Sequence, residues 1–275
     1  MASRLRASAF PPFALVCIGL AAAGCQTMRP TATADTTGAV GFASALPSGT
    51  QSDSEARREF EAAGALYRNN AGNPDIAIRY ARALRAIGER AQASAVLEQA
   101  SIKHANNKTV LGAYGRALAD AGNYAQALEV LSRAHTPEQP DWRILSVQGA
   151  VLDQLGRHEE ARRYYASALK LAPDDSAVLS NLGLSYALSK NLKEAESILR
   201  RAASRPDAKS RVRQNLALVV GLQGRYQEAE EIARADLPAE EATANVSYLR
   251  EVLAGRSDWK KSDRTGAMTA TSSGS

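Results

Sequence analysis

The 275-residue chain has very little cysteine and histidine. Its two cysteines are Cys17 and Cys25. An internal disulfide in the mature protein is excluded, because Cys17 lies in an N-terminal segment that we expect to be removed. The three histidines, His104, His135 and His158, do not stand at metal-ligand spacings. The sequence therefore predicts no metal site.

Patterns typical of catalysis and of nucleic-acid binding are also missing. The chain contains neither a glycine-rich phosphate loop nor the sharp Gly-x-Ser-x-Gly turn of a serine nucleophile. It carries a net charge of +5, but no run of basic residues interleaved with aromatic residues. We therefore expect no enzyme, no cofactor and no nucleic-acid partner.

The N-terminus has the pattern of an exported protein. Arg4 and Arg6 precede an uncharged apolar run over residues 10–23, which is short for a membrane span. The run ends in Leu20-Ala-Ala-Ala-Gly-Cys25, which resembles the lipobox of bacterial lipoproteins. The resemblance implies a signal peptide over residues 1–24 and lipidation of Cys25 with acyl chains such as palmitate. The alternative is an ordinary secretory peptide in which Cys25 is incidental.

The segment that follows Cys25 is expected to be a flexible tether. Residues 25–51 are rich in Thr, Ala, Gly, Ser and Pro and carry two charges. Gln26 stands after the cysteine where an aspartate would retain the protein at the inner membrane. By resemblance to Gram-negative lipoproteins, this favours a location at the outer membrane, facing the periplasm.

Small residues recur at a fixed spacing through the rest of the chain. The spacing is 34 residues, and the series are Ala93, Ala127, Ala161, Ala195 and Ala229; Ala81, Gly115, Gly149, Gly183 and Ala217; and Gly88, Gly122, Gly156, Lys190 and Gly224. Such a period is typical of stacked helical hairpins, in which small residues let two helices approach closely and glycine ends the first helix. At Lys190, where the glycine is missing, the following Asn191 is expected to tolerate the turn. The pattern resembles the tetratricopeptide repeat (TPR) and predicts an all-α solenoid.

The repeats divide the chain into parts. We expect a solenoid over residues 52–254 with five helical hairpins near residues 74–107, 108–141, 142–175, 176–209 and 210–237. A helix over residues 52–69 and another that begins at Pro238 and ends at Gly255 should cover the two ends. Residues 255–275, with Trp259, are expected to be a disordered tail.

A partner-binding groove is expected on the first helices of the hairpins. Residues one and five positions after the small residue of each first helix should face the groove; these are Arg82, Arg116, Ala150, Leu184 and Leu218, and Ala86, Asp120, Gln154, Leu188 and Leu222. Arg85 and Arg143 add to its basic end. A partner segment with an acidic end and an apolar end would match both halves. The alternative is that the arginines are a solvated face and the leucines fill the solenoid interior.

The later repeats resemble the TadD family of Flp pilus assembly lipoproteins. The matching stretches are Arg213-Gln-Asn-Leu-Ala-Leu-Val-Val-Gly-Leu-Gln-Gly-Arg-Tyr-Gln-Glu-Ala-Glu230, Ala235-Asp-Leu-Pro238, Asn245-Val-Ser-Tyr-Leu-Arg250, Asp141-Trp-Arg-Ile-Leu-Ser146 with Gly149, and Asp153-Gln-Leu-Gly-Arg157. The resemblance implies a role in tight-adherence (type IVb) pilus secretion. There the lipoprotein would act as a pilotin that helps the secretin ring to assemble in the outer membrane.

Other functions of the same general kind remain open from the sequence. They are a type IVa pilotin, an accessory factor of outer-membrane barrel assembly, and a periplasmic regulator of cell-wall enzymes. A cytoplasmic co-chaperone is disfavoured by the export signal. In each case the expected partner is a protein.

Overall fold

The computed structural model describes residues 50–271, and it describes side chains for residues 54–255. The described part is all-helical, which confirms the predicted fold class. Its helices are, in order, α1 (Thr50–Asn69), α2 (Pro74–Ala86), α3 (Arg90–Lys103), α4 (Lys108–Asp120), α5 (Tyr124–Ser132), α6 (Trp142–Gln154), α7 (His158–Leu171), α8 (Ser176–Leu188), α9 (Leu192–Ala203), α10 (Ser210–Leu222), α11 (Tyr226–Ala233) and α12 (Ala239–Thr271).

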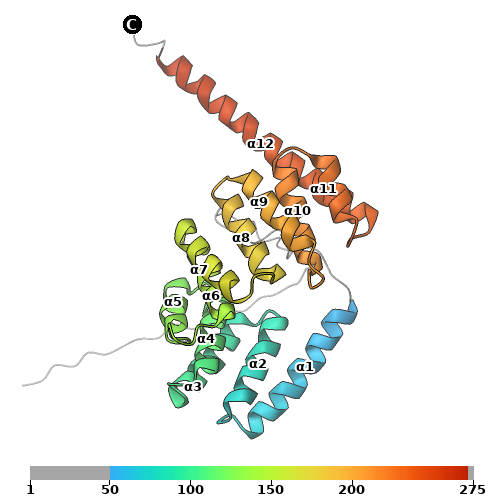
Figure 1. Ribbon diagram of the computed structural model, residues 1–275. Helices are drawn as coiled ribbons and strands as arrows, with labels where there is room; N and C mark the ends of the chain where they lie inside the picture. Colours follow the sequence, from blue (N-terminus) through green and yellow to red (C-terminus); the bar gives the residue numbers. More distant parts are fainter. Residues whose placement is uncertain (1–49, 272–275) are drawn as a thin grey trace, which may run out of the picture. The chain divides into compact units, whose positions relative to one another are not determined.

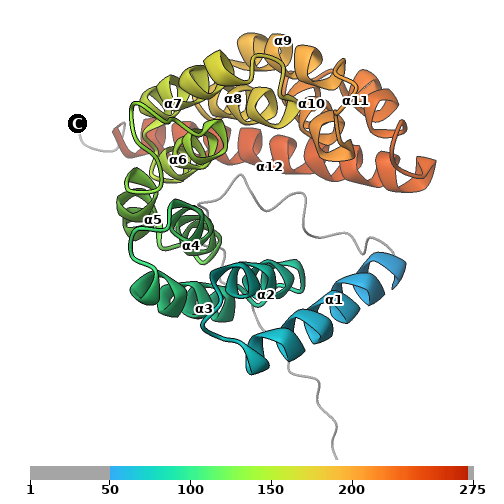
Figure 2. The same ribbon diagram turned by 60° about the horizontal axis from the view of Figure 1, so that its bottom comes forward.

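Helices α2 to α11 form five antiparallel hairpins that follow one another in chain order (Figures 1 and 2). Each second helix also packs on the first helix of the next hairpin, so the hairpins make a continuous stack. Each hairpin lies within one of the repeats expected from the sequence. Residues 1–49, which include the expected signal peptide, Cys25 and most of the expected tether, lie outside the described part, as do residues 272–275.

The small residues at 34-residue spacing lie where the two helices of a hairpin cross. Ala93, Ala127, Ala161, Ala195 and Ala229 are all fully buried, at 0% exposure. On the facing first helix, a Cβ atom added to Gly149 would lie 2.6 Å from Cε1 of Tyr165. One added to Gly183 would lie 2.6 Å from Cγ of Leu199. The spacing therefore fixes which face of each helix meets its partner.

The turns inside the hairpins follow the predicted glycines, with one difference. Gly88, Gly122, Gly156 and Gly224 have left-handed backbone conformations, with φ between 74° and 87°. In the fourth hairpin Lys190 itself takes this conformation, with φ of 64°, and Asn191 does not. The expectation that Asn191 would absorb the turn was wrong, because the position in the turn decides which residue becomes left-handed.

Helix N-caps repeat at the same spacing, a signal that the sequence-based predictions did not use. Asn73, Asn107, Asp141 and Asp175 each accept a hydrogen bond from a backbone N–H in the first turn of α2, α4, α6 and α8. These residues are 34 positions apart. Lys209 stands at the next position and makes no side-chain cap on α10.

The two ends of the stack are covered by α1 and α12. Tyr80 of α2 stacks against Tyr67 and Phe60 of α1, with ring centroids 5.0 and 5.9 Å apart. Helix α12 packs on α10 and α11 and buries Ala242 and Leu249. These apolar contacts cover core that the first and last hairpins would otherwise expose.

Helix α12 is longer than the sequence indicated. It was expected to end at Gly255 before a disordered tail, but it continues to Thr271. That expectation does not hold for residues up to 271. Gly255 is not left-handed. A glycine inside a helix costs only about 1 kcal/mol relative to alanine, and this segment contains no proline to end the helix.

The close approach at Gly149 gives a stability prediction. The variant Gly149→Ala should lower the free energy of unfolding by about 1–2 kcal/mol, because overpacking costs more than the gain in helix propensity. Tyr165 cannot move away freely, since its hydroxyl donates to Asp153 at 3.0 Å. Urea unfolding would measure the effect. Gly255→Ala is the matched control, because a Cβ there meets nothing within 4 Å; equal stability changes in the two variants would contradict the prediction.

Candidate functional site

The first helices of the hairpins lie closer to one another than the second helices do. The backbones of α2 and α4, α4 and α6, α6 and α8, and α8 and α10 approach each other closely, whereas those of successive second helices in the described part do not. Successive second helices meet through side chains, as Arg200 of α9 and Glu228 of α11 do. The first helices therefore line the inner side of the stack. We call their surface the inner face. It carries three residues of each first helix: the residue two positions before the small residue, and the residues one and five positions after it.

At the N-terminal end of the inner face, Arg82 is exposed in a hollow between α1 and α2. The hollow has a volume of about 450 Å³ and is lined by Glu55, Ala56, Glu59, Arg79, Arg82, Ala83 and Ala86. Arg79 donates two hydrogen bonds to Glu59, at 2.8 and 3.1 Å. Helix α1 therefore contributes acidic side chains to this end and neutralises one of its arginines.

Arg85 and Asp120 were both predicted as groove residues, and the structure joins them in an ion pair. The Arg85 guanidinium on α2 donates to the Asp120 carboxylate on α4, and both side chains are about one-third exposed. The pair crosses between neighbouring first helices. A partner could use the charge of Arg85 or of Asp120 only by breaking this ion pair.

Arg116 on α4 is half-buried and has no hydrogen bond or ion pair with any other described residue. Burial lowers the pKa of Arg116, the nearby Arg85 lowers it further, and Asp120 and Asp141 oppose this effect. A lowered pKa means that the surroundings destabilise the charged guanidinium. An anion placed against Arg116 would relieve that cost.

Arg143 does not join this basic group. It is exposed at the start of α6, and its guanidinium lies over the ring of its neighbour Trp142, 4.4 Å from the centroid. Gln154 at the other end of α6 is exposed and accepts a hydrogen bond from Tyr124 at 3.4 Å. The structure therefore brings Arg82, Arg85, Arg116 and Asp120 together and leaves Arg143 apart.

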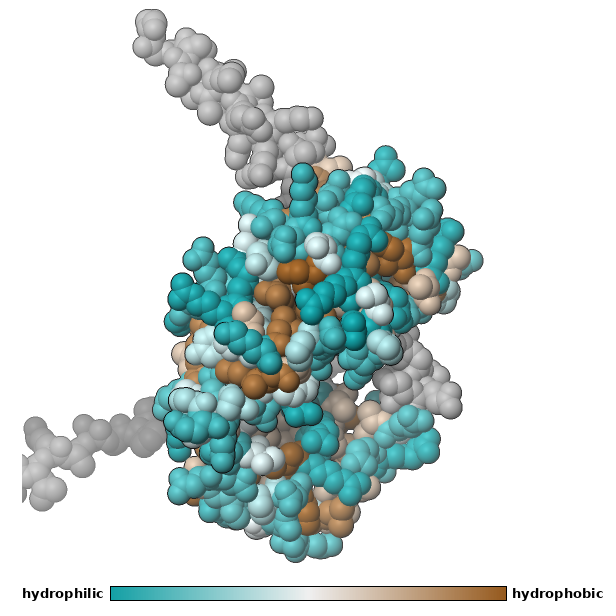
Figure 3. Space-filling model, viewed as in Figure 1, coloured by the Kyte–Doolittle hydropathy of each residue, from teal (hydrophilic) through white to brown (hydrophobic). Residues whose placement is uncertain are grey.

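The C-terminal half of the inner face is apolar. Leu184 and Leu188 on α8 and Leu218 and Leu222 on α10 are all half-buried. None of them belongs to the buried clusters that form the described core. Their side chains are therefore partly accessible on the inner face. Figure 3 shows apolar side chains gathered over α8 and neighbouring helices, among hydrophilic ones.

Two asparagines on the same half were missed by the sequence-based predictions. Asn181 donates to Ser146 at 3.2 Å, and Asn215 donates to Ser180 at 3.0 Å. Both bonds join residues 35 positions apart on neighbouring first helices. The repeated letters NLGL and NLAL at residues 181–184 and 215–218 carried the signal.

A buried polar network joins α6, α7 and α8. Asp153 of α6 accepts from Tyr165 at 3.0 Å and from Ser185 at 2.8 Å, and Nδ1 of His158 lies 2.8 Å from its carboxylate. Burial raises the pKa of Tyr165, and the adjacent Asp153 raises it further, so the phenol stays protonated. Ser185 is directed at the carboxylate and not at the imidazole ring. This geometry orders three helices and does not activate a nucleophile.

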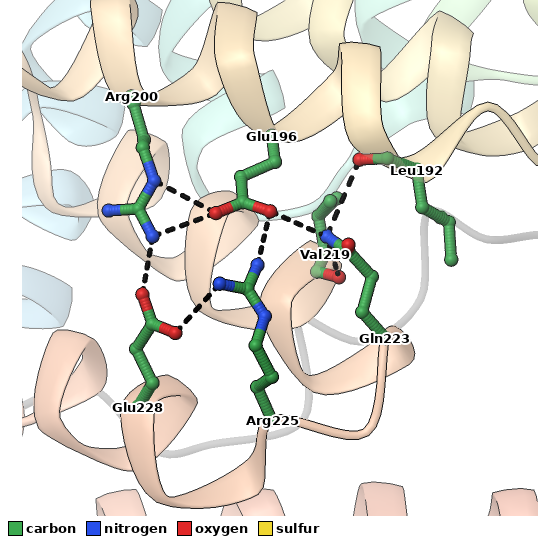
Figure 4. Close-up of polar contacts among 7 residues, drawn as sticks. All are labelled: Leu192, Glu196, Arg200, Val219, Gln223, Arg225 and Glu228. Carbon is green, nitrogen blue, oxygen red and sulfur yellow. Dashed lines mark hydrogen bonds and ion pairs between the residues drawn. The ribbon is translucent and has the colours of Figure 1, made fainter.

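A second polar cluster lies between α9 and the last hairpin (Figure 4). Glu196 accepts from Arg225, from Gln223 at 2.8 Å and from Arg200 at 2.9 Å. Glu228 closes the ring, because it accepts from both Arg200 and Arg225. The hydrogen bond from Arg225, with those from Gln223 and Arg200, lowers the pKa of Glu196 to about 2, against the opposing effect of burial.

No group of His, Cys, Asp and Glu in the described part is arranged to hold a metal ion. Within residues 50–271, no helix combines the length and the apolar character that crossing a membrane requires. Trp259 falls within α12, where side chains are not described, and Cys25 falls outside the described residues. Its lipidation therefore stays a prediction.

Comparison with known proteins gives one family match and several structural matches. The tetratricopeptide repeat model matches residues 78–141 and 147–211. TTC0263, a thermophilic TPR protein of Thermus thermophilus, has a TM-score of 0.56 at 23% identity, covering 66% of this chain and 98% of that one. A search of curated proteins found no match.

Two larger proteins are similar over part of their length. The Cut9–Hcn1 assembly has a TM-score of 0.57 at 14% identity, covering 73% of this chain and 41% of that one. The human IFIT1 dimer with PPP-AAAA has a TM-score of 0.54 at 16% identity, covering 66% of this chain and 45% of that one. The chain thus spans less than half of either protein. At these identities the likeness shows the fold alone.

The Glu196 cluster predicts a loss of stability in acid. The pKa of Glu196 is about 2 in the folded protein, against an ordinary value of 4.5. Because the folded pKa is depressed, the carboxylate stabilises the fold above pH 4.5, and this contribution is lost as the pH falls toward 2. In urea unfolding at several pH values, Glu196→Gln should therefore lose less stability than the wild type over this range.

The matched control is Glu194→Gln, which changes an exposed carboxyl on the same helix for which the structure gives no ion pair. This variant should keep the acid dependence of the wild type. Parallel pH profiles for the wild type and Glu196→Gln would contradict the prediction.

Proposed function

Since residues 78–141 and 147–211 are tetratricopeptide repeats, we propose that the chain works by holding a protein partner on the inner face of its helical stack. The observation that carries this proposal is the half-buried Arg116, whose charge has no partner in the described part although burial disfavours it. Among the described residues, the polar network around Asp153 and the cluster around Glu196 are bonded internally, so neither is left open to a charged partner.

The partner should be acidic at one end and apolar at the other. Arg82 and Arg116 offer positive charge on α2 and α4, while Arg79 and Arg85 are already paired. Half-buried leucines on α8 and α10 offer apolar surface. Complementary charge would fix the direction in which the partner lies, and apolar contact would supply affinity.

The cellular setting is proposed from the sequence. A lipid-anchored Cys25 would hold the solenoid at the periplasmic side of the outer membrane, and the tether would let it work away from the surface. Resemblance to the TadD lipoproteins supports a role in Flp pilus secretion, with the secretin as partner and a pilotin-like action. Lipid anchoring and partner binding are separable parts of this proposal.

Binding tests the partner part. In bio-layer interferometry with the purified Flp-pilus secretin, Arg116→Met should weaken binding about 10-fold or more, the usual loss when a charged hydrogen bond is removed. Arg143→Met is the matched control, because Arg143 lies over Trp142 and apart from Arg116; this variant should bind as the wild type does. Equal affinities for the wild type and Arg116→Met would overturn the role given to Arg116.

Anchoring is tested in cells. Cys25→Ala should move the protein from the membrane fraction to the soluble fraction, and secretin multimers should fall. Cys17→Ala changes a residue of the segment expected to be removed, so it should leave both unchanged. Normal levels of secretin multimers with membrane-free protein would contradict the pilotin mechanism. That result would not contradict the proposed binding to the secretin.

A further inference from the structure

Helices α8 and α10 present the same column of side chains on the inner face. Asn181, Leu184 and Leu188 stand at i, i+3 and i+7 on α8, so they share one side of the helix. Asn215, Leu218 and Leu222 repeat the arrangement on α10. All six are half-buried, and α8 contacts α10 directly. The two columns therefore lie side by side.

The amide at the head of each column is held in place. Asn181 and Asn215 each donate one N–H to a buried serine of the preceding repeat, Ser146 and Ser180. Neither side-chain oxygen has a hydrogen bond to another described residue. Each column thus offers one fixed hydrogen-bond acceptor beside two leucines.

The distance from Arg116 to the column on α8 sets how many residues of a bound segment must lie between them. Helix α4 packs on α6, and α6 packs on α8. Packed helices are about 8–10 Å apart, so two steps span roughly 16–20 Å. An extended chain covers this in about five or six residues, and a helix needs about 11–13. Helix α6 presents Val147 and Ala150 in between, and these small side chains leave room for a chain to pass.

We propose that the inner face binds its partner as an extended segment of defined spacing. An acidic side chain lies on Arg116. An apolar side chain about five or six residues away lies on the leucines of α8, and a second, about two residues further along, lies on those of α10. Backbone N–H groups of the segment donate to the oxygens of Asn181 and Asn215. This rests on the proposed function and adds the conformation and register of the bound segment.

A helical partner fits these features less well. The backbone N–H groups of a helix interior are used within the helix. An apolar helix face laid over the columns would therefore cover both asparagine oxygens without pairing them. An extended chain has free N–H groups at alternate positions, as an added strand does.

Synthetic peptides test the proposal on the purified chain. The probes are fluorescein-labelled peptides with one Glu and one Leu-x-Leu pair, separated by about two to twelve Ser, Thr or Gly residues, with affinity read by fluorescence anisotropy. We expect the tightest binding at a separation of about five or six, and binding about 10-fold weaker at the shortest and longest separations, as loss of one charged contact implies. In Arg116→Met, replacing Glu by Gln in the peptide should no longer matter.

Asn181→Ala and Asn215→Ala should each weaken the best peptide several-fold. Asn191→Ala is the control, since it removes the same side chain from the turn after α8, outside the inner face. Circular dichroism and thermal melts would confirm that each variant is folded. Unchanged binding by both inner-face variants would remove the asparagines from the site.

Three results would overturn the inference: affinity independent of the separation, no binding by any peptide, and tighter binding by a hydrocarbon-stapled helical peptide with Glu and Leu about 11–13 residues apart. The measurement of secretin binding distinguishes failure of this inference from failure of the proposed function. Secretin binding that needs Arg116 would then keep the proposed function and discard the extended conformation. Peptide binding at the expected separation without secretin binding would keep the inference and discard that partner.

Discussion

The structure depends on the close approach of two helices at one small residue in each hairpin. Gly149 has no space for a Cβ because Tyr165 occupies it, and Gly183 is limited in the same way by Leu199. This contact sets the rotation of each first helix about its axis. Once the rotation is set, the residues one and five positions later must face the inner side of the stack. The inner face is therefore a consequence of packing in the hairpins.

The charge of the inner face is decided by pairing between helices, and not by the number of arginines. Arg79 is neutralised by Glu59 of α1, and Arg85 by Asp120 of the next repeat. These pairs are partly exposed, so they contribute little to stability. Their larger effect is on recognition, because they leave Arg116 as the half-buried cation without a partner among the described residues.

Much of the fold could be predicted from the sequence, because a 34-residue period is visible within a single sequence. The buried alanines, the hairpins and the glycine turns all follow from it. The pairs Arg85–Asp120 and Asn181–Ser146 could not be predicted, since they join residues 35 positions apart and depend on how closely neighbouring first helices approach. The extent of α12 was missed because a single glycine was taken as a helix end. The left-handed conformation of Lys190 was missed because Asn191 was expected to adopt it, and the turn tolerates the strain at a lysine.

Asp153 has a consequence for how the stack would come apart. Most contacts in a repeat array join only neighbours, so disorder can spread from an end one hairpin at a time. The Asp153 carboxylate is bonded from α7 and α8 while it sits on α6, at the boundary between the charged and the apolar halves of the inner face. Fraying that starts in α12 would therefore meet a cooperative barrier there. Amide hydrogen exchange would be slowest in the helices on both sides of Asp153. The arginine-bearing hairpins would stay folded longer than the leucine-bearing ones.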